Sequence, residues 1–203
     1  MNWSARRKLA LTLLFPILCA GCATTDRKVN VLYQPVTVAT GMRGDIYLTS
    51  SGRETPLGGR AAVQWLVGTV KNREGEKSGN VVTGRSPVDQ VMDAFKQELA
   101  AAGFTVLSVA KLPAHAAGGV DITAATMELD ENFDLVKSDA TSRLSIALEL
   151  WKNGQKVRKL DYRSTLSDFA IKDRDLLLPK LLQKSLQEIM KQAVPEIANI
   201  LGE

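Results

Sequence analysis

The sequence predicts an α+β domain in which two helices pack on one face of a mainly antiparallel sheet, behind a cleaved signal peptide. Three observations carry this prediction. Apolar residues alternate along several short segments, recur at helical spacing along two others, and flank an Asn153-Gly154 pair typical of a hairpin turn. The order strand, helix, strand, three-stranded meander, helix keeps the two kinds of element segregated.

The first half of the chain contains short predicted strands. Apolar alternation begins at Val29 and continues to Val38, and a second strand is predicted over residues 45–49. A stronger strand is predicted over residues 61–71. The polar, glycine-containing segment 72–84 is predicted to be an exposed loop.

A helix is predicted to begin after Ser86, which can act as its N-cap. Pro87 suits the first helical position and Asp89 completes the capping pattern. Gly103 ends this helix, and a strand is predicted over residues 104–109. The apolar face of the helix consists of Val88, Val91, Met92, Phe95 and Leu99.

The second half of the chain predicts a meander and a long final helix. A strand over residues 120–135, with a bulge near Ala125, precedes the hairpin around Asn153-Gly154. The final helix is predicted to open near Asp173 or Asp175 and to accept a proline in its first turn. Pro195 is predicted to kink or end that helix.

The first 22 residues have the layout of a bacterial lipoprotein signal peptide. A cationic start is followed by an apolar run over residues 9–18, which is too short to span a bilayer. Ala20 and Gly21 then precede Cys22, so cleavage is predicted between Gly21 and Cys22, with lipidation of Cys22. Cys19 stands where this motif usually has Leu, Val or Ile; the alternative is an ordinary secretory signal cleaved near Ala23.

The predicted organisation therefore has three parts. Residues 1–21 form the signal peptide, residues 22–30 hold the lipidated cysteine and a short tether, and residues 31–203 form a single periplasmic α+β domain. Ala23 stands where an inner-membrane retention signal of the enteric type has Asp, which favours sorting to the outer membrane.

Composition excludes several classes of function. The 26 Lys and Arg include three in the signal peptide, which contains none of the 22 acids, so the mature chain has a net charge of only about +1. We therefore predict no nucleic-acid partner. Both cysteines lie in the signal peptide or at its end, so no disulfide, thiolate metal cluster or cofactor is predicted for the domain.

Candidate catalytic residues are few, and the sequence predicts no enzyme and no catalytic site. His115, the single histidine, has no nearby Ser, Asp or Glu at a motif spacing. Four acids, Glu128, Asp130, Glu131 and Asp134, leave open a wall-modifying hydrolase with paired carboxylates, in which Glu128 and Asp130 would share one strand face. The interpretation favoured for these acids is a solvated sheet face or a charged sheet edge.

Other conspicuous residues are predicted to be structural. Trp65 and Trp151 lie within predicted strands and are taken as core residues. A stripe formed by Lys180, Lys184 and Lys191 could contact anionic lipid headgroups, but a solvated helix face is favoured.

The layout resembles the small bacterial lipoproteins of the YajG type. The resemblance runs from the lipid cysteine through Pro35-Val36-Thr37-Val38, the helix segment 88–95, Gly103-Phe104, the Asn153-Gly154 hairpin and the long last helix. It implies a palmitate-type acyl anchor and an outer-membrane lipoprotein that faces the periplasm, with no established activity. It defines no functional residues.

Together these features predict a non-enzymatic binding or accessory module of the bacterial envelope. The membrane is reached through the lipid on Cys22, and an unidentified protein partner binds an exposed sheet face or edge. Two alternatives remain: an auxiliary lipoprotein subunit of an envelope transport or assembly machine, and a peptidoglycan-modifying hydrolase.

Overall fold

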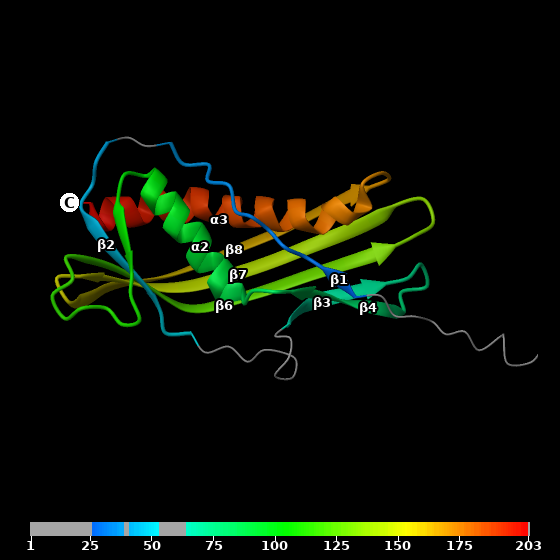
Figure 1. Cartoon of the computed structure of the whole chain (residues 1–203), viewed down its shortest axis with the longest axis horizontal. Helices are drawn as coiled ribbons and strands as arrows, with labels where there is room; N and C mark the ends of the chain where they lie inside the picture. The colour runs from blue at the N-terminus through cyan, green and yellow to red at the C-terminus, as the bar shows by residue number, and fades with distance from the viewer. Residues whose placement is uncertain (1–25, 39–40, 53–63, 203) are drawn as a thin grey trace, which may run out of the picture.

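Three long antiparallel strands form the centre of the fold (Figure 1). The computed structural model describes residues 26–38, 41–52 and 64–202. Within them, the three strands make a meander that consists of β6 (Gly118–Phe133), β7 (Ser138–Lys152) and β8 (Gln155–Ala170). The predicted meander is therefore confirmed.

The turn between β7 and β8 confirms the predicted hairpin. Asn153 and Gly154 have positive φ angles of 54° and 76°, as a two-residue type I′ turn requires. The bulge in β6 lies between Ile122 and Ala124, close to the predicted position at Ala125. From this bulge onward, the residues of β6 that face the helices change from even to odd numbers.

Two short strands lie along the edge of β6 that β7 leaves free, and both run parallel to β6. They are β2 (Asp45–Ser50), beside the start of β6, and β3 (Trp65–Lys71), beside its end. Gly68 permits the second contact, because a Cβ atom there would lie 1.8 Å from the carbonyl oxygen of Leu129.

Three further strands complete an eight-stranded mixed sheet. β5 pairs parallel with β2, β1 pairs parallel with β4, and β4 pairs antiparallel with β3. Their bounds are β1 (Arg27–Lys28), β4 (Lys77–Thr83) and β5 (Thr105–Ser108).

The prediction of a mainly antiparallel sheet is therefore wrong, because four of the seven strand pairings are parallel. The physical reason is the length of β6. Its 16 residues leave an edge long enough for both six-residue β2 and seven-residue β3. Alternation in a sequence reports which face of a strand is buried, and it does not report the direction of the neighbouring strand.

Two helices cover one face of this sheet (Figure 1). α2 (Pro87–Ala101) begins where predicted, and the Ser86 hydroxyl accepts a hydrogen bond of 2.9 Å from the backbone N–H of Asp89. α3 (Leu177–Leu201) follows a short 3₁₀ turn, η2 (Arg174–Leu176). Pro195 lies inside α3, so it does not end the helix.

The core lies between the helices and the sheet. The largest fully buried side chains are Phe95, Ile46, Leu48, Leu99, Ile122, Leu129, Leu144, Ile146, Leu148, Leu150, Leu181 and Leu182. They come from both helices and from strands at the centre of the sheet, so one continuous apolar layer holds the elements together.

The strand predicted over residues 29–38 is absent, and this segment instead crosses the helices (Figure 1). We call residues 29–38 the strap. The buried carboxylate of Glu98 on α2 accepts hydrogen bonds from the backbone N–H groups of Val36 and Thr37, at 2.8 and 2.9 Å, and from the Tyr33 hydroxyl. A helix side chain thus satisfies backbone donors that the prediction assigned to a neighbouring strand.

Two other predicted segments differ from the structure. Residues 77–83 of the predicted loop form β4, because Val81, Val82 and Thr83 are buried apolar or hydroxyl side chains that pack beside β3. Within the segment 22–30 that was predicted to hold the lipidated cysteine and tether, residues 27 and 28 form β1, and residues 22–25 lie outside the described residues.

Candidate functional site on the open face of the sheet

The face of the sheet opposite the helices carries polar side chains from all three long strands. We call this surface the open face and define it by the outward residues of the meander: Thr126, Glu128, Asp130, Thr141, Arg143, Ser145, Arg163, Thr165 and Ser167. Cross-strand pairing places these residues beside one another, because residues of one parity lie on one side of each strand.

A salt-bridge cluster lies at the centre of the open face. The Arg143 guanidinium contacts the carboxylates of Glu128 at 2.9 Å and of Asp130 at 3.1 Å. Thr69 on β3 also donates a hydrogen bond of 2.9 Å to Asp130. Burial raises the pKa of Asp130, but the hydrogen bonds from Thr69 and Arg143 outweigh it, so this pKa lies below its ordinary value.

A shallow groove of about 320 Å³ runs beside this cluster. Its lining combines the guanidinium groups of Arg143 and Arg163 with the hydroxyl groups of Ser145 and Thr165. Because Glu128 also lines the groove, it offers charges of both signs, together with hydroxyl groups, to an extended polar ligand. Ser164 is a further lining residue, and its hydroxyl donates a hydrogen bond of 2.5 Å to the carboxylate of Glu188 on α3.

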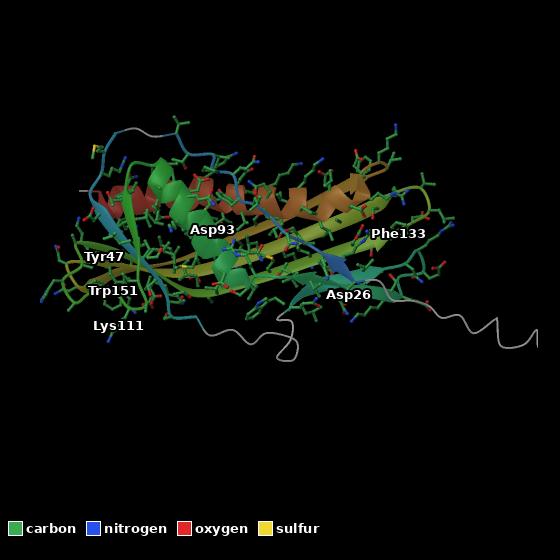
Figure 2. All side chains as sticks on the ribbon, in the orientation of Figure 1. Asp26, Tyr47, Asp93, Lys111, Phe133 and Trp151 are labelled. Atoms are coloured by element: carbon green, nitrogen blue, oxygen red, sulfur yellow. The ribbon has the colours of Figure 1, made fainter. Side chains whose placement is uncertain are left out.

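A second cleft, of about 330 Å³, opens at the end of the sheet where β7 finishes. Its lining includes the apolar side chains of Leu112, Pro113 and Trp151, and the charged side chains of Lys111 and Asp121. Figure 2 shows Trp151 and Lys111 together at this end of the molecule. We call it the Trp151 cleft.

The Trp151 cleft has one unsatisfied donor. Among the described residues, the buried indole N–H of Trp151 has no hydrogen-bond acceptor.

The structure brings together two of the four acids that the hydrolase alternative could use and places the other two elsewhere. Glu128 and Asp130 share the open face, whereas Glu131 lies on the covered face, is 1 % exposed and contacts Arg27 at 3.3 Å. Asp134 lies in the turn after β6. Neither Glu131 nor Asp134 can therefore form, with an acid on the open face, a catalytic pair that flanks one glycosidic bond.

The remaining sequence candidates lie apart from the open face or outside the described residues. His115 is exposed in the loop before β6. Lys184 on α3 contacts Asp168 on β8 at 3.1 Å. The cleavage site Gly21–Cys22 lies outside the described residues.

Sequence reasoning missed the two features that shape this surface. Trp151 was predicted to be a core residue, but it lines the cleft. Arg143 was not singled out, although the pairing of Glu128 with Arg143 follows once the register of the meander is fixed. The sequence does contain a signal for Arg143: it is a charged residue at a position that alternates with the apolar residues of the hairpin strand.

Within residues 26–38, 41–52 and 64–202, no three His, Cys, Asp or Glu side chains are grouped closely enough to hold a metal ion. In the same part of the chain, neither helix combines the length and apolar character needed to cross a bilayer.

No family model and no curated protein matches this chain. Several solved structures are similar to it, among them the following three. A minor lipoprotein from Acinetobacter baumannii is 12 % identical, with 66 % of this chain and 94 % of that chain covered and a TM-score of 0.43. A Xanthomonas campestris protein of the DUF330 family is 13 % identical, with 88 % and 96 % covered and a TM-score of 0.45.

The third structure is rare lipoprotein B from Shewanella oneidensis. It is 8 % identical, with 66 % of this chain and 91 % of that chain covered and a TM-score of 0.28. Two of these three structures are lipoproteins. With TM-scores below 0.5, no role is transferred from them.

Proposed function

We propose that this chain is a lipid-anchored, non-enzymatic binding protein of the bacterial envelope, with the open face as its binding surface. The observation that carries the proposal is the N-terminal segment, which ends in Ala20-Gly21-Cys22 only four residues before the described domain begins at Asp26. The anchor fixes the domain at a membrane, and the open face presents charged and hydroxyl groups to a partner.

The finer proposal is an outer-membrane lipoprotein of the YajG type that faces the periplasm. Ala23 supports the outer membrane, because it replaces the Asp of the enteric retention signal. The partner we propose is an envelope protein.

The proposal of a non-enzymatic role is supported by the state of the acids. A glycosidase needs one carboxyl group that stays protonated, which requires a raised pKa. The pKa of Asp130 is lowered instead, and Arg143 contacts both Asp130 and Glu128. We expect the purified chain to release no soluble glycan from isolated sacculi; release that Glu128→Gln abolishes would establish the hydrolase.

The anchor is tested by replacing each cysteine in turn in the full-length chain. We expect Cys22→Ser to abolish incorporation of radiolabelled palmitate and to move the protein from the membrane fraction to the soluble fraction. Cys19→Ser is the matched control, because Cys19 lies in the segment that is removed, and it should retain the label. Palmitate incorporation by Cys22→Ser would contradict the anchor.

The binding surface is tested by site-specific photocrosslinking in intact cells. A photoreactive residue at exposed Thr165 on the open face should form an adduct with a partner, whereas one at exposed Lys191 on α3 should not. Adducts with a membrane transport complex would identify the chain as its auxiliary subunit. Identical adducts at both positions, or none at Thr165, would contradict binding through the open face.

A further inference from the structure

Exposed apolar side chains gather at one end of the sheet. Among the described residues, twelve large apolar side chains are exposed, and six of them lie at this end. Leu135 is 85 % exposed and Phe169 is 60 % exposed. We call this group the apolar tip: Phe133, Leu135, Val136, Phe169, Ile171 and Leu176. Exposed apolar groups of this size mark contact surfaces.

The backbone of the tip is held by a single arginine. The Arg174 guanidinium donates hydrogen bonds to the carbonyl oxygens of Asp134 at 3.0 Å, Leu135 at 2.9 Å and Val136 at 2.5 Å, and lies 5.1 Å from the centre of the Phe133 ring. These carbonyl groups therefore keep a partner when water is removed. Unpaired carbonyl groups would make entry into an apolar phase costly.

The tip lies where the chain enters the domain from Cys22. Arg27 on β1 contacts Asp175, next to Leu176 of the tip, at 2.6 Å. Figure 2 shows Asp26 and Phe133 toward the same end of the molecule, opposite Trp151. The four residues from Cys22 to Asp26 can extend over no more than about 14 Å.

We propose that the apolar tip inserts into the interface of the lipid bilayer that holds the acyl chains of Cys22. This inference rests on the proposed anchor, because acylation of Cys22 would keep the tip within reach of the bilayer surface. Burial of the tip side chains among lipid acyl chains then supplies a second point of attachment beside Cys22, which fixes the orientation of the domain. The domain is thereby oriented with the Trp151 cleft pointing away from the membrane.

Charges around the tip indicate that apolar burial is the driving force. Lys137 contacts Asp139 at 2.9 Å, and the exposed pair Lys172 and Asp173 carries opposite charges. No single sign dominates these positions, so attraction to anionic headgroups adds little. We therefore expect binding that depends only weakly on salt.

The first experiment places a fluorophore at the tip of the acylated chain. Because Cys22 is blocked by acylation, Val136→Cys supplies a single thiol for an NBD label. In vesicles of phosphatidylethanolamine and phosphatidylglycerol that contain brominated lipid, we expect the emission of this label to fall by about half, as for a side chain at interfacial depth. Gln155→Cys, at the first residue of β8 and thus at its opposite end, is the matched control and should not be quenched.

The second experiment measures the tip without the anchor. For this measurement, the Cys22→Ser chain is produced without the signal peptide, residues 1–21, and is sedimented with the same vesicles. Replacing Leu135 and Phe169 by Ser should lower the bound-to-free ratio by about tenfold or more, because two exposed apolar side chains lose their burial in lipid. Val157→Ser, which removes an exposed apolar side chain near the other end of β8, should leave the ratio unchanged.

These two experiments separate the inference from the proposed anchor. Palmitate labelling of the same preparation reports on the anchor alone. If the chain is acylated and membrane-bound but the label at position 136 is not quenched, the proposed insertion of the tip is overturned. The proposed anchor is then unaffected. Quenching that requires a second protein would also overturn the proposed insertion. Melting curves check that the Ser variants are folded.

Discussion

The two faces of the β6–β8 meander divide stability from recognition. Along β7, Leu144, Ile146, Leu148 and Leu150 point toward the helices and are at most 2 % exposed. The odd-numbered residues that alternate with them, among them the charged Arg143 and Glu149, point to the open face. The even-numbered residues of this strand therefore bury apolar surface, and the odd-numbered residues form a polar surface. The core and the polar surface can thus be altered by separate substitutions.

Polar groups on the two faces also differ in how they are satisfied. On the covered face, Ser142 and Ser185 form a hydrogen bond of 2.9 Å inside the core, and buried Glu131 accepts one from Ser138. On the open face, Arg143 and Glu128 also pair with each other, but their side chains are 48 % and 57 % exposed. Polar groups of the covered face are thus paired away from solvent, whereas the paired groups of the open face stay accessible to a ligand.

The comparison predicts its largest effect at the covered face. Leu148→Ala should lower the free energy of unfolding by about 2–5 kcal/mol, because it leaves a cavity in the core. Its neighbour Glu149, which contacts Lys156 at 3.1 Å on the open face, is the matched control. Glu149→Ala should cost no more than about 1 kcal/mol. Urea denaturation of both variants measures the difference, and equal costs would break the comparison.

A smaller effect is predicted for Glu98, the carboxylate beneath the strap. Glu98→Gln should lower the free energy of unfolding by about 1–3 kcal/mol, because an amide accepts fewer of the three hydrogen bonds and loses the charge. Glu74→Gln, in the exposed turn before β4, should be neutral.

The cost of Glu98→Gln should also depend on pH. Burial raises the pKa of Glu98, but hydrogen bonds from Thr37, Tyr33 and Val36 outweigh it and hold this pKa below its ordinary value of 4.5. A lowered folded-state pKa stabilises the protein above the unfolded-state value, and this stabilisation is lost as the pH falls through the folded-state value. Melting temperatures of wild type and Glu98→Gln should therefore converge below pH 4.5. A constant difference would contradict this role.

The smallest change in stability is predicted at the open face. Arg143→Ala should change the free energy of unfolding by less than about 1 kcal/mol, because its salt bridges are exposed. The same variant should lower the yield of the Thr165 photoadduct, since it removes a donor from the groove. A large loss of stability would show that the open face also holds the fold.

Sequence patterns predicted the long elements and failed where partners are distant in the chain. Ser86, Gly103 and Asn153-Gly154 act through their neighbours in sequence, so α2 and the hairpin could be located. The parallel addition of β2 to β6 depends on residues about 70 positions apart. The strap depends on Glu98, and nothing in its own apolar alternation indicates that a helix side chain replaces a neighbouring strand.

The candidate site was predictable in part for the same reason. Glu128 and Asp130 were predicted to share a strand face, because that follows from alternation, and they do. The bulge between Ile122 and Ala124 shifts which residues of β6 point outward, and the register that results decides that Arg143 lies opposite Glu128. The Trp151 cleft also needs the loop before β6, whose position no local pattern predicts.

The length of the meander sets a distance as well as a surface. The two turns of the meander lie at opposite ends of β7, whose fourteen residue steps correspond to about 47 Å at the usual strand rise. The strands therefore act as a rigid spacer, and adding two residues to each would lengthen it by about 7 Å without exchanging the two faces. Spacer length is a property that selection could tune independently of both surfaces.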